Sequence, residues 1–388
     1  MNYDNLEIID FIDLKFNNLT KKYGFRKIFP KSMSDISVSK LYDETKFKLL
    51  KVIDNTGDIN ILHEDPTISI LDSPISSGKF FYLTNTFSFK ENSEDLKGGV
   101  EILLPYSINI DIELIVMIYE FLESLGVSDF EIEIGNTHFI EQLLNIDKMS
   151  LEIKNKLFKL IHNKNILKIE KVLNSLDVTN NEKRALLALP KLFGDFEEIL
   201  GAMSDLGIEN TLKIKTYFKS FYELLSFYKI DLSKIKIDLS FTNKYSYYDG
   251  FIFKAYSKEL GKEIITGGRY DVLNKKGTGF GFNIKNLIGV IKMNNNKKNV
   301  EFTVLTDAEG NKKSIIIANN LRRKGFGVNL LENDLNSKLI KEVDSNYIIA
   351  TKENIITIVD NKQNKIIKKD YKKFMESIES YTLRESIH

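Results

Sequence analysis

Three consecutive segments near the end of the first three quarters of the chain decide the fold. They read SYYDGFIFKAYS at 246–257, KEIITGGRYDVL at 262–273 and GTGFGFNIKNLI at 277–288. Alternating, β-branched and aromatic residues are typical of strands, and the last segment changes to helical spacing. The glycines allow a tight turn or a close approach between backbones, and they lack the spacing of a phosphate-binding loop. The segments therefore predict strands, the last of which runs into a helix.

The first 136 residues predict a helix and several further strands. Apolar residues recur with helical spacing from Ile8 to Leu19, and Gly24 follows as a stop. The remaining elements are a short strand over 25–30, a hairpin around the turn at 55–58, a strand pair over 79–89 and 98–105 joined by a polar stretch at 90–97, a helix over 110–126 and a strand over 129–135. Such an order indicates an α+β core built on antiparallel strands.

The periodicity changes again along the second half of the chain. Helical patterns fill the middle, strand patterns return, and the polar run KMNNNKKN ends the core before strands and helices alternate to the end. We predict an α+β fold with an antiparallel sheet core at 1–136 and 228–292, a helical insertion at 137–227, a linker at 293–299 and a small C-terminal α/β domain at 300–388.

Composition excludes several classes of protein. The 388 residues carry a net charge of +1, and residues 297–388 hold only 17 basic against 13 acidic side chains, so nonspecific nucleic-acid binding is disfavoured. Cysteine is absent and the four histidines lie far apart, which argues against disulfides and a metal site. No apolar run approaches the ~20 residues of a membrane span, and the start is acidic. We expect a cytoplasmic protein without a cofactor.

In order and content, these segments resemble the histidyl-tRNA synthetases. In that family a Tyr-Tyr element, here Tyr247 and Tyr248, precedes a Gly-Gly-Arg-Tyr-Asp element, here 267–271, and a final strand–helix motif. YGFRKIFP at 23–30 resembles the family's dimer-forming first motif, and the C-terminal part resembles its anticodon-binding domain. The resemblance covers nearly the whole chain and implies the class II aminoacyl-tRNA synthetase fold.

Activation of histidine by ATP concentrates negative charge at phosphorus, which preorganised cations must stabilise. The synthetases resembled here use arginines from three places, and the matching positions hold Ser88, Asn243 and Asn286. Serine and asparagine supply no fixed positive charge. We therefore expect no adenylation chemistry and no catalytic residues in this chain.

The resemblance also implies a histidine-binding pocket. Asp65 and Thr67 match residues that hold the α-amino group, and Glu101 matches the acid that binds the imidazole. Lys97 replaces a glutamine that faces the amino group, so it would repel an ammonium. The implied set is Asp65, Thr67, Lys97, Glu101, Tyr247, Tyr248, Gly267, Gly268 and Arg269. Ordinary roles are the alternative: strand-edge acids, a core tyrosine, and a salt bridge between Arg269 and Asp271 that braces the turn.

A synthetase-like chain without these arginines resembles the regulatory subunits of ATP phosphoribosyltransferase. That group implies a homodimer that joins short-form catalytic subunits in a hetero-octamer, for the first step of histidine biosynthesis, with L-histidine as the effector. Two alternatives stay open, because the C-terminal domain is also a synthetase feature. One is a divergent histidyl-tRNA synthetase, and the other is a paralogue that senses uncharged tRNA or serves as a scaffold.

Overall fold

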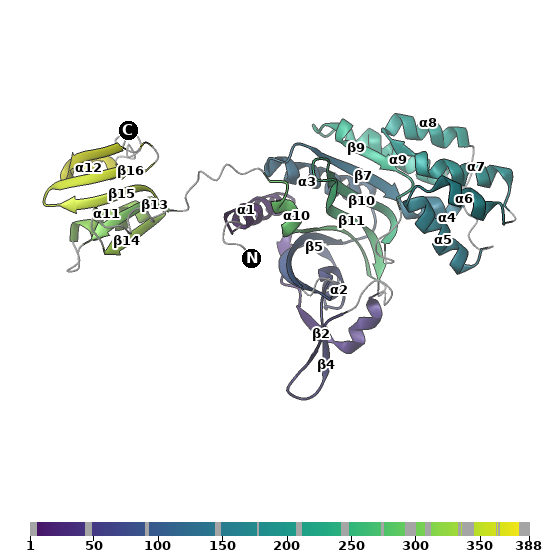
Figure 1. Ribbon diagram of the computed structural model, residues 1–388, viewed down its shortest axis with the longest axis horizontal. Helices are drawn as coiled ribbons and strands as arrows, with labels where there is room; N and C mark the ends of the chain where they lie inside the picture. The colour runs from purple at the N-terminus through teal and green to yellow at the C-terminus, as the bar shows by residue number, and fades with distance from the viewer. Residues whose placement is uncertain are drawn as a thin grey trace. The chain divides into compact units, whose positions relative to one another are not determined.

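The computed structural model describes residues 6–42, 49–89, 93–143, 149–176, 178–206, 212–241, 248–272, 275–291, 300–306, 312–332, 335, 345–361, 363 and 365–379. The chain forms two compact units, Met1–Lys292 and Met293–His388. Figure 1 shows the elements of both units, coloured along the chain.

A nine-stranded sheet organises the first unit, in the order β1-β5-β6-β12-β11-β10-β7-β9-β8. Its neighbouring strands are antiparallel except for the pairs β1–β5 and β7–β9. The strands are β1 Arg26–Lys27, β5 Gly78–Ser88, β6 Ser93–Leu103, β7 Phe130–Asn136, β8 Phe193–Gly194, β9 Ile235–Asp238, β10 Tyr248–Ser257, β11 Lys262–Val272 and β12 Lys275–Asn283. The predicted antiparallel core is confirmed. The segments 246–257, 262–273 and 277–288 contribute the adjacent strands β10, β11 and β12.

Two faces of this sheet are covered differently. Helices α1 (Leu6–Lys22), α3 (Ile108–Ser124) and α10 (Ile284–Ile288) supply one cover. There the ring of Phe282 lies 4.9 Å from that of Phe16 and 5.2 Å from that of Phe121, centroid to centroid. On the other face, α2 (Pro66–Leu71) packs Ile70 and Leu71 into a buried cluster with Phe80, Tyr82, Leu103 and Tyr270. The functional site lies on this α2 face.

The predicted helical run is present between β7 and β9. Its helices are α4 Thr137–Leu143, α5 Leu151–His162, α6 Ile166–Leu173, α7 Asn180–Ala188, α8 Phe196–Leu206 and α9 Leu212–Leu225, with 3₁₀ turns at Leu189–Lys191 and Leu232–Lys234. Thr179 and Glu182 form a capping box that fixes the start of α7. Helix α9 contacts the large sheet, since the rings of Phe221 and Phe251 lie 5.4 Å apart.

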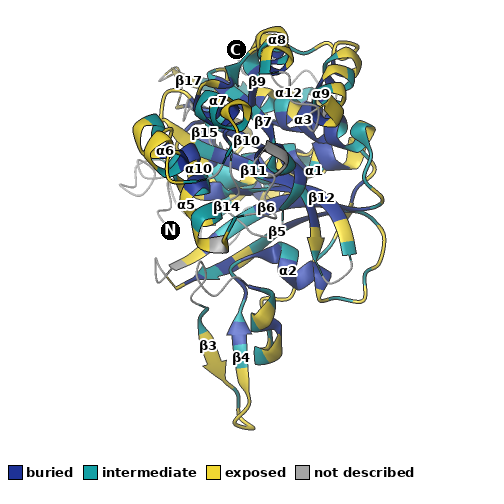
Figure 2. Ribbon diagram, turned by 90° about the vertical axis from the view of Figure 1, so that its right-hand side faces the viewer, coloured by how far each residue is buried: buried dark blue, intermediate teal, exposed yellow. Residues whose placement is uncertain are grey.

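A small sheet extends the α2 side of the first unit. It consists of β2 (Met33–Asp35), β4 (Ile59–Leu62) and β3 (Lys51–Ile53), in that order, with a 3₁₀ helix at Ile36–Leu41. The predicted hairpin is the antiparallel pair β3–β4, whose turn places Gly57 at φ +90°, a conformation that favours glycine. Figure 2 shows the mostly exposed residues of this hairpin.

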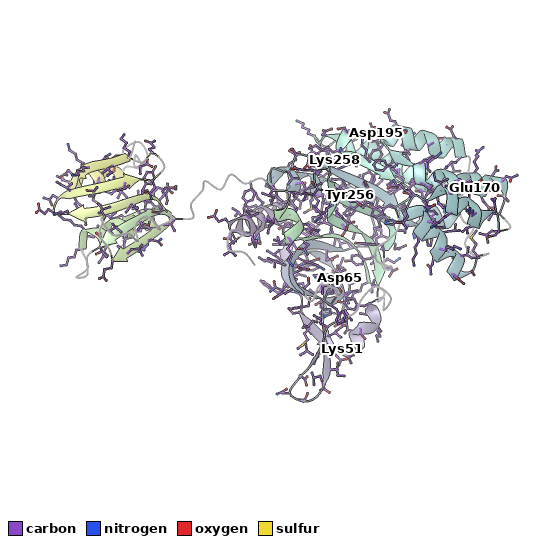
Figure 3. The ribbon with its side chains drawn as sticks, viewed as in Figure 1. Lys51, Asp65, Glu170, Asp195, Tyr256 and Lys258 are labelled. Carbon is purple, nitrogen blue, oxygen red and sulfur yellow. The ribbon has the colours of Figure 1, made fainter. Side chains whose placement is uncertain are left out.

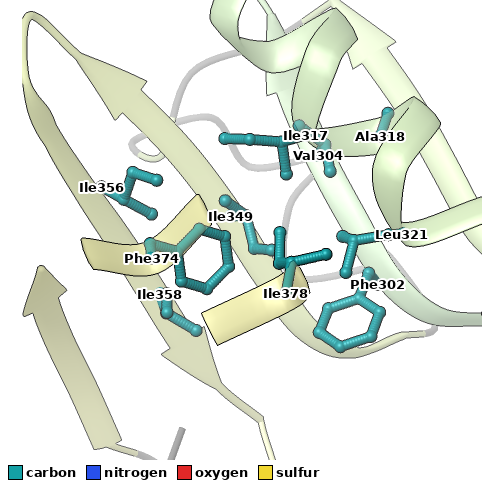
Figure 4. Packing of buried hydrophobic residues seen from close by; sticks show 10 residues of the cluster. All are labelled: Phe302, Val304, Ile317, Ala318, Leu321, Ile349, Ile356, Ile358, Phe374 and Ile378. Atoms are coloured by element: carbon teal, nitrogen blue, oxygen red, sulfur yellow. The ribbon is translucent and has the colours of Figure 1, made fainter. Parts of the chain in front are cut away.

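The second unit has its own core. Its sheet has the order β14-β13-β15-β16-β17, with strands β13 Val300–Thr306, β14 Val328–Glu332, β15 Ser345–Lys352, β16 Ile355–Asp360 and β17 Lys365–Asp370. Helices α11 (Lys312–Arg323) and α12 (Tyr371–Glu379) pack against it. Figure 4 shows the cluster between them, in which Phe302, Leu321 and Phe374 are at most 1% exposed.

Two of the differences from the sequence-based prediction concern strands on the β5–β6 side of the large sheet. The polar stretch 90–97 was expected to be a connection, but β6 begins at Ser93 and pairs with β5 down to Ser88. Alternation rather than polarity identifies this strand, because Asp95 is buried while Glu94 is exposed. The strand expected over 25–30 is reduced to the two residues of β1.

A candidate ligand-binding cavity

A cavity of about 450 Å³ lies between α2 and the large sheet. Five residues of the predicted set line it together: Asp65, Thr67, Lys97, Glu101 and Tyr248. Figure 3 labels Asp65 in this part of the first unit. Other lining residues are Glu64, Pro66, Tyr82, Ser88, Asp95, Gly98, Glu263, Ile264, Ile265, Thr266, Tyr270, Gly279, Phe280, Gly281, Phe282, Asn283, Lys285 and Asn286. Positions from 64 to 286 thus converge on one site.

Strand alternation decides which side chains face the cavity. Lys97 and Glu101 both line it, and the strand period of two puts Gly99 between them on the same face. A Cβ on Gly99 would stand 2.5 Å from the Tyr82 hydroxyl, and one on Gly279 would stand 2.5 Å from Oε2 of Glu101. The glycines therefore leave room for functional side chains. Gly281 differs, because a Cβ there would meet nothing nearer than 3.7 Å.

Glu101 is the centre of a buried hydrogen-bond network. The Thr67 hydroxyl donates to Oε1 at 2.7 Å, and the Tyr270 hydroxyl donates to Oε2 at 2.5 Å. Burial raises the pKa of Glu101 from 4.5 to about 8, although both hydrogen bonds oppose the rise. Burial likewise raises the pKa of Tyr270 well above its usual value, reinforced by the adjacent Glu101. The carboxyl group is thus held in place and poised to exchange a proton with a basic ligand.

The short helix α2 positions Asp65 and Thr67. Asp65 is the N-cap, and its Oδ1 accepts a hydrogen bond from the main-chain N–H of Thr67 at 3.0 Å. Pro66 occupies the first helical turn, where a proline costs no backbone hydrogen bond. The Asp-Pro-Thr sequence therefore orients both side chains beside Glu101.

The cavity is rich in acids. Among the described lining residues, the five acids Glu64, Asp65, Asp95, Glu101 and Glu263 face two lysines, Lys97 and Lys285, and no arginine. Lys285 forms an ion pair with the buried Asp95. Lys97 donates from Nζ to the main-chain oxygen of Glu64 at 2.8 Å. This balance favours a ligand that carries positive charge or N–H donors.

Two of the three positions predicted to have lost an arginine lie at the cavity. Ser88 and Asn286 both line it, and Asn286 donates from Nδ2 to the main-chain oxygen of Glu263 at 3.2 Å. The third position, Asn243, lies outside the described residues, as does Tyr247 of the predicted binding set.

Arg269 lies on the helix-covered face of β11, not on the cavity face. Its guanidinium binds Asp111 of α3 through two nitrogens, and it lies 5.4 Å from the ring centre of Tyr217 on α9. The adjacent Tyr270 faces the cavity, because successive strand residues alternate. The predicted bridge to Asp271 is also replaced, since Asp271 pairs with Lys276 at 3.5 Å.

Gly267 and Gly268 adjoin protein atoms. A Cβ on Gly267 would lie 2.5 Å from the Phe253 ring, on the helix-covered face. Gly268 has φ +159°, and a Cβ there would lie 2.7 Å from the Phe251 oxygen and 3.0 Å from the Tyr248 ring. The pair thus allows close strand packing, and Gly268 makes room for the cavity residue Tyr248.

Sequence reasoning missed Tyr82, Tyr270 and Gly281. Tyr270 is adjacent to Arg269 in the motif at 267–271. The predicted set would have included Tyr270 instead of Arg269 if the face of β11 that meets the cavity had been assigned correctly. Tyr82 and Gly281 are brought to the cavity by the register of β5, β6 and β12. In that register Tyr82 is opposite Gly99, and Gly99 is opposite Gly281. Such cross-strand register leaves little trace in one sequence.

Among the residues that the structure describes, no cluster of three or more histidine, aspartate or glutamate side chains is arranged to hold a metal ion. Within the same residues, no helix has the length and apolar character needed to cross a membrane.

Comparison with known proteins first defines the class. The family model described as Histidyl-tRNA synthetase matches residues 9–287. The solved structure of histidyl-tRNA synthetase from Nostoc sp. superposes with a TM-score of 0.81 at 15% identity, covering 97% of this chain and 95% of that one. The chain therefore has the histidyl-tRNA synthetase fold.

Curated relatives then define the family within that class. The ATP phosphoribosyltransferase regulatory subunit of Clostridium kluyveri is 30% identical over 303 residues, 72% of this chain and 77% of that protein. The protein of the same name from Clostridium botulinum is 29% identical over 384 residues, covering 92% of this chain and 91% of its own length. The chain belongs to the family of ATP phosphoribosyltransferase regulatory subunits.

Proposed function

We propose that this chain is a non-catalytic regulatory subunit of ATP phosphoribosyltransferase, and that its cavity binds L-histidine as a feedback effector. The relatives named above support the regulatory role. By the same names, the partner is a separate catalytic subunit, which we take to be the short form. The reaction is then the first step of histidine biosynthesis.

The single observation that carries the non-catalytic role is the charge of the cavity. Glu101 is mostly protonated, and Asp95 is paired with Lys285. The remaining acids, Glu64, Asp65 and Glu263, still outnumber Lys97 and disfavour a bound triphosphate. Adenylation needs preorganised cations at the reacting phosphorus. By the family resemblance, Ser88 and Asn286, which line the cavity, occupy positions where the synthetases use arginine. Neither residue supplies that charge. The synthetase fold is therefore used here for binding without adenylation.

Histidine suits the acidic end of the cavity. The Glu101 carboxyl accepts from Thr67 and Tyr270, and a protonated imidazole would add a charge-assisted hydrogen bond to it. Because burial raises the pKa of Glu101 to about 8, the protonated carboxyl can also donate a hydrogen bond to a neutral imidazole. Asp65, at the N-terminus of α2, offers a carboxylate to the α-ammonium.

Regulation follows from differential affinity. Histidine changes the activity of a complex only if it binds one assembly state more tightly than another. We expect homodimers of this chain to assemble with catalytic subunits into a hetero-octamer, in which the cavity reports histidine concentration to the partner.

Reconstitution tests the proposal. The chain is mixed with the short-form catalytic subunit of the same organism, and phosphoribosyl-ATP formation is followed with each protein alone, with both, and with histidine added. Activity that requires both proteins and falls with histidine is the expected result. In parallel, histidine-dependent ATP–pyrophosphate exchange is measured on the chain alone, and we expect none.

Two results would contradict the proposal. Exchange activity would return the chain to the aminoacyl-tRNA synthetases. Failure of the two proteins to associate, together with salt-dependent binding of tRNA, would favour a tRNA-sensing paralogue.

A further inference from the structure

Lys97 differs from the other lysine of the cavity in the kind of partner that it has. Lys285 is neutralised by the buried carboxylate of Asp95. The Nζ of Lys97 instead donates to a main-chain carbonyl, that of Glu64, at 2.8 Å. A carbonyl accepts a hydrogen bond but carries no net charge to balance an ammonium. Lys97 is half-buried at the wall of the cavity, where an anionic ligand group would gain a charge-assisted hydrogen bond.

The spacing along β6 gives the cavity two chemically different ends. Lys97 and Glu101 are four residues apart on one face, so their Cα atoms are separated by about 13 Å. Between them Tyr82 covers Gly99, whereas Gly281 of β12, opposite Gly99, lines the cavity at a point where a Cβ would have room. A cation at one end, a carboxyl at the other and open space at Gly281 match an extended zwitterion with a basic side chain.

Asp65 connects the two ends, because Glu64 directly before it binds Lys97 and its own carboxylate accepts from Thr67, which donates to Glu101. The carbonyl that holds Lys97 belongs to Glu64, the residue directly before Asp65. A ligand α-carbon at this point would have a cation and a carboxylate on adjoining parts of the wall. We propose, on the basis of the function proposed above, that Lys97 binds the α-carboxylate of the amino-acid ligand and so selects amino acids over their decarboxylated analogues.

This assignment reverses the role expected from sequence. As a lone substitution, Lys97 would repel the ligand's ammonium. In the structure the described cavity wall contains no arginine, so Lys97 supplies the cation that a carboxylate needs, while Asp65 and Glu101 take the basic groups. Lysine and glutamine differ at this position by a full charge, which makes the effect measurable.

Calorimetric titration of the full chain tests the assignment. The ligands are L-histidine, histamine, which lacks the carboxylate, and imidazole propionate, which lacks the ammonium. The wild-type chain should bind histidine about 10- to 100-fold more tightly than histamine. Lys97→Gln should weaken the binding of histidine by a similar factor and leave the binding of histamine nearly unchanged, so the preference for histidine should be lost. The binding of imidazole propionate should also be weaker in this variant.

Lys285→Gln is the matched control, because it removes the same charge from the same cavity. It should keep the preference for histidine over histamine, although its unfolding midpoint should fall because the buried Asp95 loses its cation. The unfolding midpoint of Lys97→Gln should be close to that of the wild-type chain, because Lys97 donates to a main-chain oxygen. Equal weakening of histidine and histamine by Lys97→Gln, or tighter histidine binding, would overturn the assignment. So would the absence of histidine binding to the wild-type chain, even if reconstitution shows that the chain activates the catalytic subunit.

Discussion

Glu101 shows how one buried group combines binding and a cost in stability. The residue is 3% exposed, and its two hydroxyl partners do not compensate for the loss of water. An empty cavity therefore holds the carboxyl group mostly protonated at neutral pH. A basic ligand would convert this unfavourable burial into a paired charge.

Glu101→Gln tests this interpretation in the absence of ligand. Between about pH 5 and 8 the folded state keeps the Glu101 proton while the unfolded chain has lost it, so the wild-type stability falls as pH rises. Relative to the variant, the free energy of unfolding of the wild-type chain should fall by up to about 1.4 kcal/mol per pH unit, and this fall should level off above pH 8. Urea unfolding of both proteins at several pH values measures this difference. A difference that is independent of pH would mean that Glu101 is already ionised.

Gly281 offers a substitution that enters the cavity without a clash. A Cβ there would lie 3.7 Å from the Tyr82 hydroxyl, so Gly281→Ala should fold normally. The methyl group would occupy ligand space and should weaken histidine binding about tenfold. Gly279→Ala is the matched control, because its Cβ would stand 2.2 Å from the Val100 oxygen and should destabilise the fold itself by roughly 1–3 kcal/mol. Unchanged histidine affinity in Gly281→Ala would place the ligand elsewhere.

Tyr248 is a further cavity residue of the predicted set whose role a single substitution can test. Its ring adjoins Gly268, and it lines the cavity at the start of β10. In the reconstituted enzyme, Tyr248→Ala should raise the histidine concentration needed for half inhibition without loss of activation. Half inhibition at the same histidine concentration as in the wild-type complex would show that Tyr248 is not part of the effector site.

At the scale of elements, an ion pair between Arg269 and Asp111 links β11 to the covering helix α3. Asp111 is fully buried and also accepts a hydrogen bond from Tyr217 of α9 at 2.7 Å. Arg269 thereby joins a strand of the cavity, a covering helix and the helical segment. The neighbouring Tyr270 holds Glu101, so the same strand carries binding on one face and anchoring on the other.

Removing only one partner of the Arg269–Asp111 ion pair should lower the free energy of unfolding. Arg269→Met leaves the Asp111 carboxylate buried without its cation and should lower the free energy of unfolding by about 3–5 kcal/mol. The double variant Arg269→Met, Asp111→Asn removes both charges and should recover part of that loss. Denaturant unfolding of the two variants decides the point. Equal stability of single and double variants would show that the charge of Asp111 is not the cause.

At the scale of the whole molecule, each of the two compact units has a core of its own. The second unit buries a cluster that includes Phe302, Leu321 and Phe374, drawn from its sheet and both of its helices. We therefore expect it to fold without the first unit, and we expect the histidine site to belong to the first unit alone.

A truncated chain of residues 1–292 and a fragment of residues 293–388 test this separation. The first should bind histidine with the affinity of the full chain, and the second should unfold cooperatively on heating. Phe374→Ala should destabilise the second unit by about 3–5 kcal/mol and leave histidine affinity of the full chain unchanged. Loss of histidine binding in the truncated chain would make the second unit part of the site.

The sequence alone determined the types of most elements of the large sheet and the helical segment. Periodicity is local, so the antiparallel strands and the longer helices could be predicted from neighbouring residues, whereas the short helix α2 was not expected. Family resemblance supplied Asp65, Thr67, Glu101 and Tyr248, which the structure brings to the same cavity.

Only the tertiary structure decided which face of each strand meets the cavity. A shift of one residue exchanges Arg269 for Tyr270, and nothing in the motif itself fixes that phase. The packing of α3 against one face of the sheet fixes it, because Asp111 can bind Arg269 only from that side. The same register sets Tyr82 over Gly99 and leaves Gly281 open. The packing of the segment before α2 gives Lys97 a carbonyl, that of Glu64, as its partner. Those relations join residues far apart in the chain, and they arise only when the strands pair.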